Sequence, residues 1–254
     1  MTKIALISDI HANLEALDAV LAHIDAQSDI ESIYCLGDVV GYGPDPIGVI
    51  DRVRERCEFC LLGNHDHALI TSPIGFNAIA AGAIACQRQE VEPGILSLPD
   101  KKARWEFLHQ LPEERIFGEN HFVHASPRDK IYEYILPNDP EYNPDKMTEV
   151  FQHVENRCFV GHTHIPGVFL QERGFLSLED VQGAYAFIPG EKVIFNVSSV
   201  GQPRDRDPRA CYAVLAEDGL TWERVEYDVE STIRKVEASS CLDDRCDLRL
   251  REGR

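Results

Sequence analysis

The first sixty residues alternate short apolar runs with amphipathic segments, and this order constrains the fold more than any other feature. Asn13 precedes residues 14–27, whose apolar positions form one helical stripe, so we expect a capped helix there and a second one over 45–56. The first apolar run lacks apolar–polar alternation, as expected for a strand buried on both faces. The resulting βαβαβ order predicts a parallel sheet with right-handed crossovers. The three predicted strands are 3–8 (KIALIS), 32–37 (SIYCLG) and 58–63 (EFCLLG).

The middle of the chain predicts further helices and two more strands. Residues 74–110 have a helical composition that is broken by VEPG and LP, and 144–156 predicts another helix after a loop at 137–145. The short apolar runs at 120–125 and 157–162 are predicted strands.

The C-terminal half has a different sequence pattern. After His164, short β-branched and aromatic runs are separated by Gly and charged turns, which is typical of antiparallel strands and predicts that this half supplies a second sheet. Residues 229–254 predict one or two polar surface helices. We therefore expect one α/β domain over 1–254, with a core to about 228 and a helical tail from about 229.

The charge of the chain bears on its partners. With 25 Lys and Arg against 43 Asp and Glu, the formal net charge is −18, and no stretch is basic enough to form a nucleic-acid footprint. An acidic protein repels polyanions, so a phosphate-containing substrate would need locally fixed positive charge, for instance metal ions.

The cysteines and the N-terminus indicate a reducing compartment. Cys57 and Cys60 form a C-x-x-C without a second pair at zinc spacing, so reduced and mostly buried thiols are expected for all eight cysteines. Asp9 and His11 interrupt the first apolar run too early for a signal peptide. The longest mostly apolar segment, 74–86, is shorter than the roughly 20 residues that span a bilayer. We expect a cytoplasmic protein without a membrane partner.

Residues able to hold a metal follow five predicted strands. Each of these motifs is common by itself: a D-x-H can be a helix start, a Gly-Asp can be a turn, and a lone His can be a satisfied core residue. In open α/β sheets, however, sites gather at the carboxyl ends of the strands, and five chance placements there are improbable together. The motifs are D9-I-H11, G37-D38, G63-N64-H65-D66, H124 and G161-H162-T-H164.

This ordered set resembles the signature of the calcineurin-like metallophosphoesterases, and the resemblance runs from residue 3 to about 205. GDVVGYGPDP (37–46) and NVSSVGQPRD (196–205) are further similar to the small prokaryotic, phosphodiesterase-like branch of that family. The resemblance implies a four-layer α/β/β/α sandwich, in which two mixed β-sheets are flanked by helices.

The resemblance also implies two divalent metal ions bridged by Asp38. Mixed nitrogen and oxygen ligands suit Mn, Fe, Ni, Co or Zn. Ala125 stands where many relatives have Gly, so His121 is kept as a rival of His124. The implied ligands are Asp9, His11, Asp38 and His164 for one metal, and Asp38, Asn64, His124 and His162 for the other.

The same resemblance implies a role for His65 as the general acid that protonates, or hydrogen-bonds to, the departing alkoxide. Asp66 would orient His65 and raise its pKa, although a helix cap is an alternative role. His67 is expected to face solvent.

Two residues outside these motifs are candidate substrate ligands. Asn13 could contact phosphate in addition to capping its helix. Arg204 could bind substrate oxygens, or form an ion pair with Asp205 or Asp207. Tyr42 could border the pocket or be an exposed loop residue.

The sequence therefore predicts a metal-dependent phosphoesterase that hydrolyses phosphodiester or phosphomonoester bonds by means of a hydroxide that two metals share. Its expected partner is a phosphorylated small molecule, with diesters favoured and nucleic acid disfavoured by the charge. A serine/threonine-type protein phosphatase and a protein-binding scaffold of the same fold are the alternatives. The natural substrate and the oligomeric state are left open by the sequence.

Overall fold

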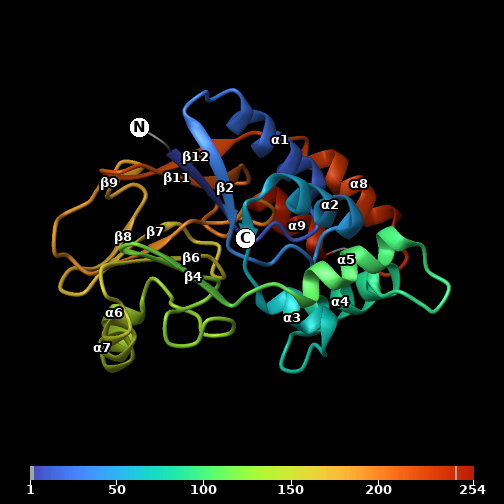
Figure 1. Ribbon diagram of the computed structural model, residues 1–254, viewed down its shortest axis with the longest axis horizontal. Coiled ribbons are helices and arrows are strands. Elements are labelled where there is room, and N and C mark those ends of the chain that lie inside the picture. The colour runs from blue at the N-terminus through green and yellow to red at the C-terminus, as the bar shows by residue number, and fades with distance from the viewer. Residues whose placement is uncertain (1–2, 244) are drawn as a thin grey trace.

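The computed structural model describes residues 3–243 and 245–254, and these form two six-stranded sheets with helices on both outer faces (Figure 1). The first sheet has the order β3-β2-β1-β11-β12-β9, and the second has the order β4-β5-β6-β10-β7-β8. The strands of the first sheet are β1 (Lys3–Ile7), β2 (Ile30–Cys35), β3 (Phe59–Cys60), β9 (Ala184–Ala186), β11 (Ala210–Leu215) and β12 (Gly219–Val225). Those of the second are β4 (Glu114–Phe117), β5 (Asn120–Val123), β6 (Arg157–Val160), β7 (Gly167–Leu170), β8 (Gly174–Ser177) and β10 (Val193–Asn196).

The helices lie outside the two sheets. In Figure 1, α1, α2 and α8 lie beside the first sheet, whereas α6 and α7 lie at the opposite end, below the second. The helices are α1 (Leu14–Asp25), α2 (Pro46–Arg56), α3 (Asn64–Ile70), α4 (Ala78–Val91), α5 (Pro99–His109), α6 (Asp139–Tyr142), α7 (Pro144–Gln152), α8 (Val229–Ala238) and α9 (Arg245–Glu252).

The alternation of side chains along the central strands builds three separate cores. In β1, Ala5 and Ile7 pack against the helices of the first sheet, while Leu6 faces the second sheet. In β6, Phe159 lies between the sheets, and its neighbour Val160 packs in the core that includes α7. These three apolar layers confirm the predicted four-layer sandwich.

The parallel unit is confirmed, but the origin of the second sheet differs from the prediction. β1 pairs parallel with β2, and β2 with β3. The C-terminal strands do not form a sheet of their own: β11 adds antiparallel to β1 and carries β12 and β9 into the first sheet. Strand β10 pairs parallel with β6, which the expectation of antiparallel strands missed. Long-range pairing of this kind leaves no local signal in the sequence.

Several smaller elements also differ from the predictions. Strand β4 forms an unpredicted hairpin with β5, and the one-turn helix α6 lies within the predicted loop. The C-terminal tail is not only a polar surface element, because Val236 and Leu242 are buried in one cluster with Tyr42 and residues of α4.

The cysteine prediction was wrong at two positions. Cys86 and Cys241 form a disulfide across 155 residues of sequence, with their Cα atoms 5.8 Å apart, and it ties α4 to the segment before α9. Spacing alone does not reveal such a pairing. Cys57 follows α2, before β3 begins, so it does not share a strand with Cys60, and both are free thiols. Among the described residues, no helix combines the length and the apolar character that crossing a bilayer requires.

Candidate metal centre

The five predicted motifs meet at the carboxyl ends of their strands, and their side chains are buried. Asp9 and His11 follow β1, Asp38 follows β2, and Asn64 is the first residue of α3, the helix that follows β3. His124 comes after β5, and the two histidines at 162 and 164 come after β6. Two sets of ligand-type atoms, each within 4.8 Å of one another, result: Asp9, His11, Asp38 and His164, and Asp38, His124 and His162.

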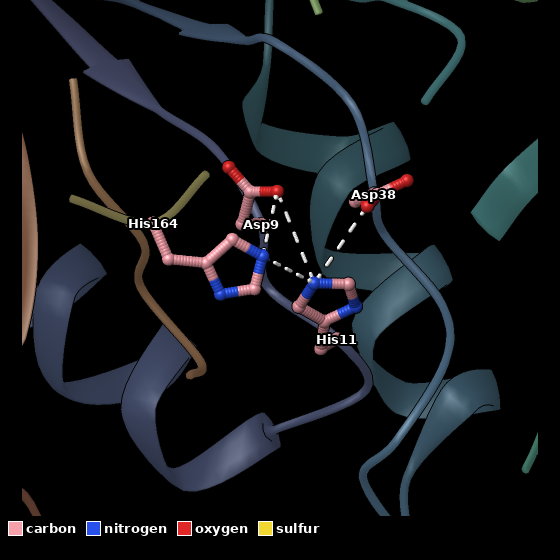
Figure 2. Close-up of side chains that lie close together, drawn as sticks. All are labelled: Asp9, His11, Asp38 and His164. Atoms are coloured by element: carbon pink, nitrogen blue, oxygen red, sulfur yellow. Dashed lines mark hydrogen bonds and ion pairs between the residues drawn. The ribbon is translucent and has the colours of Figure 1, made fainter. Parts of the chain in front are cut away.

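The first set converges from three loops, as Figure 2 shows. His164 Nε2 lies 3.3 Å from Asp9 Oδ1 and 3.1 Å from His11 Nε2. His11 Nε2 in turn lies 3.7 Å from Asp38 Oδ2. The imidazoles of His11 and His164 and the carboxylate of Asp9 thus point their acceptor atoms at one centre. Asp38 lies on the far side of that centre.

The second set lies on the other side of Asp38. His124 Nε2 is 3.4 Å from Asp38 Oδ2 and 3.2 Å from Asn64 Oδ1. The ring of His162 packs on that of His124 with centroids 5.0 Å apart. Asp38 therefore belongs to both sets, and its second oxygen, Oδ1, accepts a hydrogen bond from His65 N at 2.8 Å.

Backbone carbonyls fix the orientation of the imidazoles. Nδ1 of His11 donates to the carbonyl of Val40 at 3.0 Å, and Nδ1 of His124 donates to that of Leu36 at 2.9 Å. His164 Nδ1 makes the same kind of bond, to the Gln202 carbonyl at 2.5 Å. With Nδ1 carrying the proton, Nε2 is left as the lone-pair nitrogen that faces the centre, which is the arrangement of metal-ligating histidines.

The ring of His162 is oriented through its other nitrogen, Nε2. Its Nε2 lies 3.2 Å from the carbonyl oxygen of Tyr132, which leaves Nδ1 as the nitrogen available to a ligand. Its backbone N–H donates to Asp9 Oδ2 at 2.9 Å, so the β6 loop is tied to the β1 loop.

The electrostatics of the two sets suit cations. Burial lowers the pKa of His11 and of His162 to about 3, so both imidazoles are neutral, the form that binds metals. Burial also disfavours a charged His124, but the adjacent Asp38 carboxylate outweighs it and raises the pKa of His124 to about 9. A metal bound there would displace that proton.

One carboxylate oxygen points to the same conclusion. Asp9 Oδ1 is buried and has no hydrogen-bond partner among the described residues, although buried polar atoms are almost always satisfied. It lies between Nε2 of His11 and Nε2 of His164, which offer lone pairs rather than protons. A cation at this point would satisfy all three atoms, so the residues present fit a metal.

The loops that carry these side chains are strained. Asp9, His11, Asp38, His162 and His164 have φ between 49° and 63°, in the left-handed region that non-glycine residues rarely adopt. Strain of this kind persists only where the surroundings impose it, and it clusters at functional sites.

Two motif glycines permit the close packing of these loops. A Cβ on Gly63 would collide with the backbone and Oδ1 of Asp38. A Cβ on Gly161 would collide with Ser8 Oγ and Asp9 Oδ2. The glycines of G-N-H-D and G-H-x-H are therefore required by the approach of the neighbouring ligand loop.

We expect Gly161→Ala to lower the free energy of unfolding by about 1–3 kcal/mol, the usual cost of overpacking a closely packed site. The matched control is Gly82→Ala in α4, where an added Cβ meets nothing within 4 Å and helix propensity favours Ala. Thermal and urea unfolding of both variants measure the difference. Equal stabilities of the two variants would contradict the close approach described here.

The structure corrects the expected partnership of Asp66 with His65. Asp66 Oδ1 accepts from the backbone N–H groups of Val39 and Val40, and Oδ2 accepts from that of Gly63. Within the part of the chain that the structure describes, the buried His65 Nδ1 has no hydrogen-bond partner. Asp66 therefore joins the β2 and β3 loops, as in the capping alternative, because main-chain donors occupy its carboxylate.

The pKa directions follow from this arrangement. Burial lowers the pKa of His65 well below its usual value, opposite to the predicted rise. Burial also raises the pKa of Asp66 to about 7, against the backbone hydrogen bonds that favour its ionised form. A neutral His65 can donate a hydrogen bond, but it is not a ready source of a proton at neutral pH.

Asn13 caps α1 as predicted, whereas its expected contact with substrate stays a prediction. Its Oδ1 accepts from Ala16 N and from Thr232 Oγ1, while its Nδ2 donates to the Gly201 carbonyl and to the Tyr227 hydroxyl. Through these hydrogen bonds, the buried amide of Asn13 joins α1 to α8 and to the loop that contains Gly201.

Arg204 lies near the centre without the ion pair that was its alternative. Asp205 pairs with Arg224, and Asp207 pairs with Arg209. The Arg204 guanidinium donates to Gln202 and lies over the Tyr42 ring, 5.9 Å from its centroid. Its positive charge contributes to the low pKa of His65. Arg204 is thus within electrostatic reach of the site.

The structure also shows the surroundings of His121, His67 and Tyr42. His121 Nε2 pairs with Glu114 on the β4–β5 hairpin, 2.8 Å away, whereas His124 belongs to one of the two sets of ligand-type atoms. His67 is half-buried, and its Nδ1 forms a solvent-exposed hydrogen bond with the Tyr132 hydroxyl. Tyr42 is buried beside His65, with ring centroids 4.8 Å apart.

An open cleft of about 290 Å³ leads to the centre, and sequence reasoning missed most of its walls. Aromatic side chains outside the predicted strands were the only available signal. The lining residues are Tyr42, Asn64, His65, Ile74, Gly75, Phe76, Asn77, Tyr132, Tyr134 and His162.

Comparison with known proteins agrees with this geometry. The family model for calcineurin-like phosphoesterases matches residues 2–169, the part that contains every ligand-type residue described above. The chain belongs to this family. It is 37% identical to an uncharacterized protein of Methanocaldococcus jannaschii over 244 residues, which cover 92% of each chain.

The fold of this phosphoesterase is shared by solved structures. The crystal structure of a metallophosphoesterase from Sphaerobacter thermophilus superposes with a TM-score of 0.80 at 32% identity, over 100% of this chain and 99% of that one. A symmetrical bis(5′-nucleosyl)-tetraphosphatase of Paracidovorax citrulli is 34% identical over 125 residues, which are 47% of this chain and 42% of that protein.

Proposed function

We propose that this phosphoesterase is a dinuclear metal-dependent hydrolase of a small phosphorylated molecule, and that it prefers phosphodiesters to phosphomonoesters. The observation that carries the proposal is Asp38, which is shared between two buried Asp/His sets, one of which includes His162 from the lining of the open cleft. Membership of the phosphoesterase family supports the same reaction class.

The proposed ligands follow the geometry of the two sets. When bound, divalent ions would supply the positive charge that polarises a phosphoryl group and the acidity that activates water. The nitrogen and oxygen donors suit Mn, Fe, Co, Ni or Zn better than Ca or Mg. One ion would be held by Asp9, His11, Asp38 and His164, and the other by Asp38, Asn64, His124 and His162.

The chain's own residues would orient the substrate. His65 lines the cleft beside Asn64 and His162, so we propose that it donates a hydrogen bond from its neutral ring to a phosphoryl or leaving-group oxygen. Arg204 would add positive charge near the same oxygens. Asp66 would act indirectly, since it fixes the loop that carries Asp38 against the start of α3, which carries His65.

A small substrate is favoured over a polymer. The net charge of −18 repels nucleic acids unless positive charge is concentrated locally. The named activity of the Paracidovorax citrulli relative, a bis(5′-nucleosyl)-tetraphosphatase, is directed at a small phosphorylated molecule. Both points support a small-molecule substrate for this chain.

Hydrolysis of two chromogenic esters tests the proposal. With Mn²⁺ present, we expect kcat/KM for bis(p-nitrophenyl) phosphate to exceed that for p-nitrophenyl phosphate by about tenfold or more, which corresponds to about 1.4 kcal/mol of transition-state stabilisation. The cleft is open above the metal centre and leaves room for a second ester group. Removal of the metal by a chelator serves as the control.

The other outcomes assign other functions. A preference for the monoester would contradict the diester proposal and would favour a phosphatase. No hydrolysis of either ester by protein with both metals bound would overturn the hydrolase proposal in favour of a binding scaffold of the same fold.

A further inference from the structure

The cleft above the metal centre has two walls that come from different parts of the chain. One wall is the segment between α3 and α4, which contributes Ile74, Gly75, Phe76 and Asn77. The other is the segment after β5, which contributes Tyr132 and Tyr134. Both walls stand over a floor that includes Asn64, His65 and His162.

The aromatic rings of both walls touch the floor. Tyr134 packs on the ring of His162, with centroids 3.9 Å apart and an interplanar angle of 32°. Phe76 meets the ring of His65 edge-on at 5.0 Å. Any group that enters the cleft beside a phosphate at the metal centre therefore contacts aromatic surface.

The rings are also uncovered. Tyr132 is 42% exposed, Tyr134 is 45% exposed, and the side chain of Ile74 is 84% exposed. Half-exposed aromatic and aliphatic side chains gathered at one opening mark a binding surface rather than part of the core.

The lining carries no Asp, Glu, Lys or Arg among the described residues, although the chain as a whole is strongly acidic. Acidic walls would repel a phosphate ester, and basic walls would mark a polyanion site. Neutral aromatic walls beside a cation site suit a ligand with a phosphate at one end and a flat, uncharged group at the other.

We propose that this cleft binds a planar heteroaromatic group, such as a nucleobase, that is carried on the same molecule as the phosphate reacting at the metal centre. This inference rests on the proposed function and names the substrate class. Stacking suits the walls because every nucleobase has a π-face, and base–aromatic stacking needs no charged partner. The ring of Tyr134 is the principal stacking surface, because it adjoins the floor through His162 and remains exposed.

The test is equilibrium binding to the full-length protein, measured by calorimetry with Mn²⁺ in excess over protein and ligand. The probes are α,β-methyleneadenosine 5′-diphosphate and methylenediphosphonate, which share the P–C–P unit and differ by the adenosine. We expect the adenosine-bearing probe to bind about tenfold more tightly or better.

Substitutions locate the subsite. Tyr134→Ala should weaken binding of the adenosine-bearing probe about 5- to 150-fold, the range expected for the loss of one stacking ring. It should affect binding of methylenediphosphonate much less. Tyr134→Phe keeps the ring and should restore binding to within about threefold of wild type. Tyr142→Ala removes an exposed tyrosine on α6, outside the cleft, and is the matched control.

The outcomes separate this inference from the proposed function. Equal affinity of the wild-type protein for the two probes, or an equal loss in Tyr142→Ala, would overturn the aromatic subsite. If Tyr134→Ala does not fold, Tyr132→Ala and the wild-type comparison still decide the matter. Failure to hydrolyse any phosphate ester would overturn the proposed function, but it would leave the binding comparison unaffected.

Discussion

Asp38→Ala removes both metal ions at once and reduces phosphoester hydrolysis by more than about 100-fold. Loss of a residue that merely hydrogen-bonds to a metal ligand lowers metal affinity or activity about 10- to 100-fold, so loss of a shared ligand should lower activity at least as much. The reason lies in the geometry, because Asp38 Oδ2 is 3.7 Å from His11 Nε2 in one set and 3.4 Å from His124 Nε2 in the other. Elemental analysis of the purified variant, together with its kcat/KM, provides the measurement.

The control for this variant is Asp51→Ala. Asp51 is a carboxylate of α2 that pairs with Arg104, and it lies outside both metal sets. It should keep full metal content. An Asp38→Ala protein that retains one equivalent of metal would show that the two sets do not share this carboxylate.

His65→Ala keeps its metal and loses turnover by about 10²- to 10³-fold, the usual effect of removing one hydrogen-bond donor aimed at a reacting oxygen. His65 lines the cleft, but its side chain belongs to neither metal set. Its low pKa keeps the ring neutral, so the loss should vary little between pH 6 and pH 8. Metal content and kcat at several pH values test both statements.

Two further variants test whether the lost turnover of His65→Ala results from the missing hydrogen-bond donor. His65→Gln retains a donor and should recover part of the activity, while His153→Ala, an exposed histidine after α7, should resemble wild type. Circular dichroism checks the fold, because His65 packs against Tyr42 and Phe76. Loss of metal from folded His65→Ala would make His65 a ligand and contradict the role proposed here.

The parts of the molecule that sequence predicted best are those encoded locally. Asp9 and His11 share one short segment after a buried strand, and the strand itself is recognisable from its apolar run. Asn13 precedes an amphipathic stripe and caps α1, as its position predicts. Because parallel strands end at one edge of a sheet, the convergence of the motifs followed from the predicted topology.

What the sequence did not reveal depends on contacts between distant segments. The β11 strand joins the first sheet through pairing with β1, about 200 residues earlier, and no local pattern encodes that choice. The disulfide from Cys86 to Cys241 is equally remote.

The role of Asp66 was misjudged for a related reason. A carboxylate next to a histidine in the sequence predicts that the two side chains pair. The folded backbone instead presents the N–H groups of Gly63, Val39 and Val40 to Asp66. Main-chain donors are invisible in a sequence, whereas the choice of His124 over His121 became clear once the strand was placed against β4.

Anomalous diffraction from crystals of the Mn²⁺-loaded protein tests the central claim most directly. We predict two peaks about 3.5–4 Å apart, the separation of metals that act as a pair. Asp38 should contact both, with His11 and His164 at one and His124 and His162 at the other. A single peak, or two peaks of which only one contacts Asp38, would contradict the account.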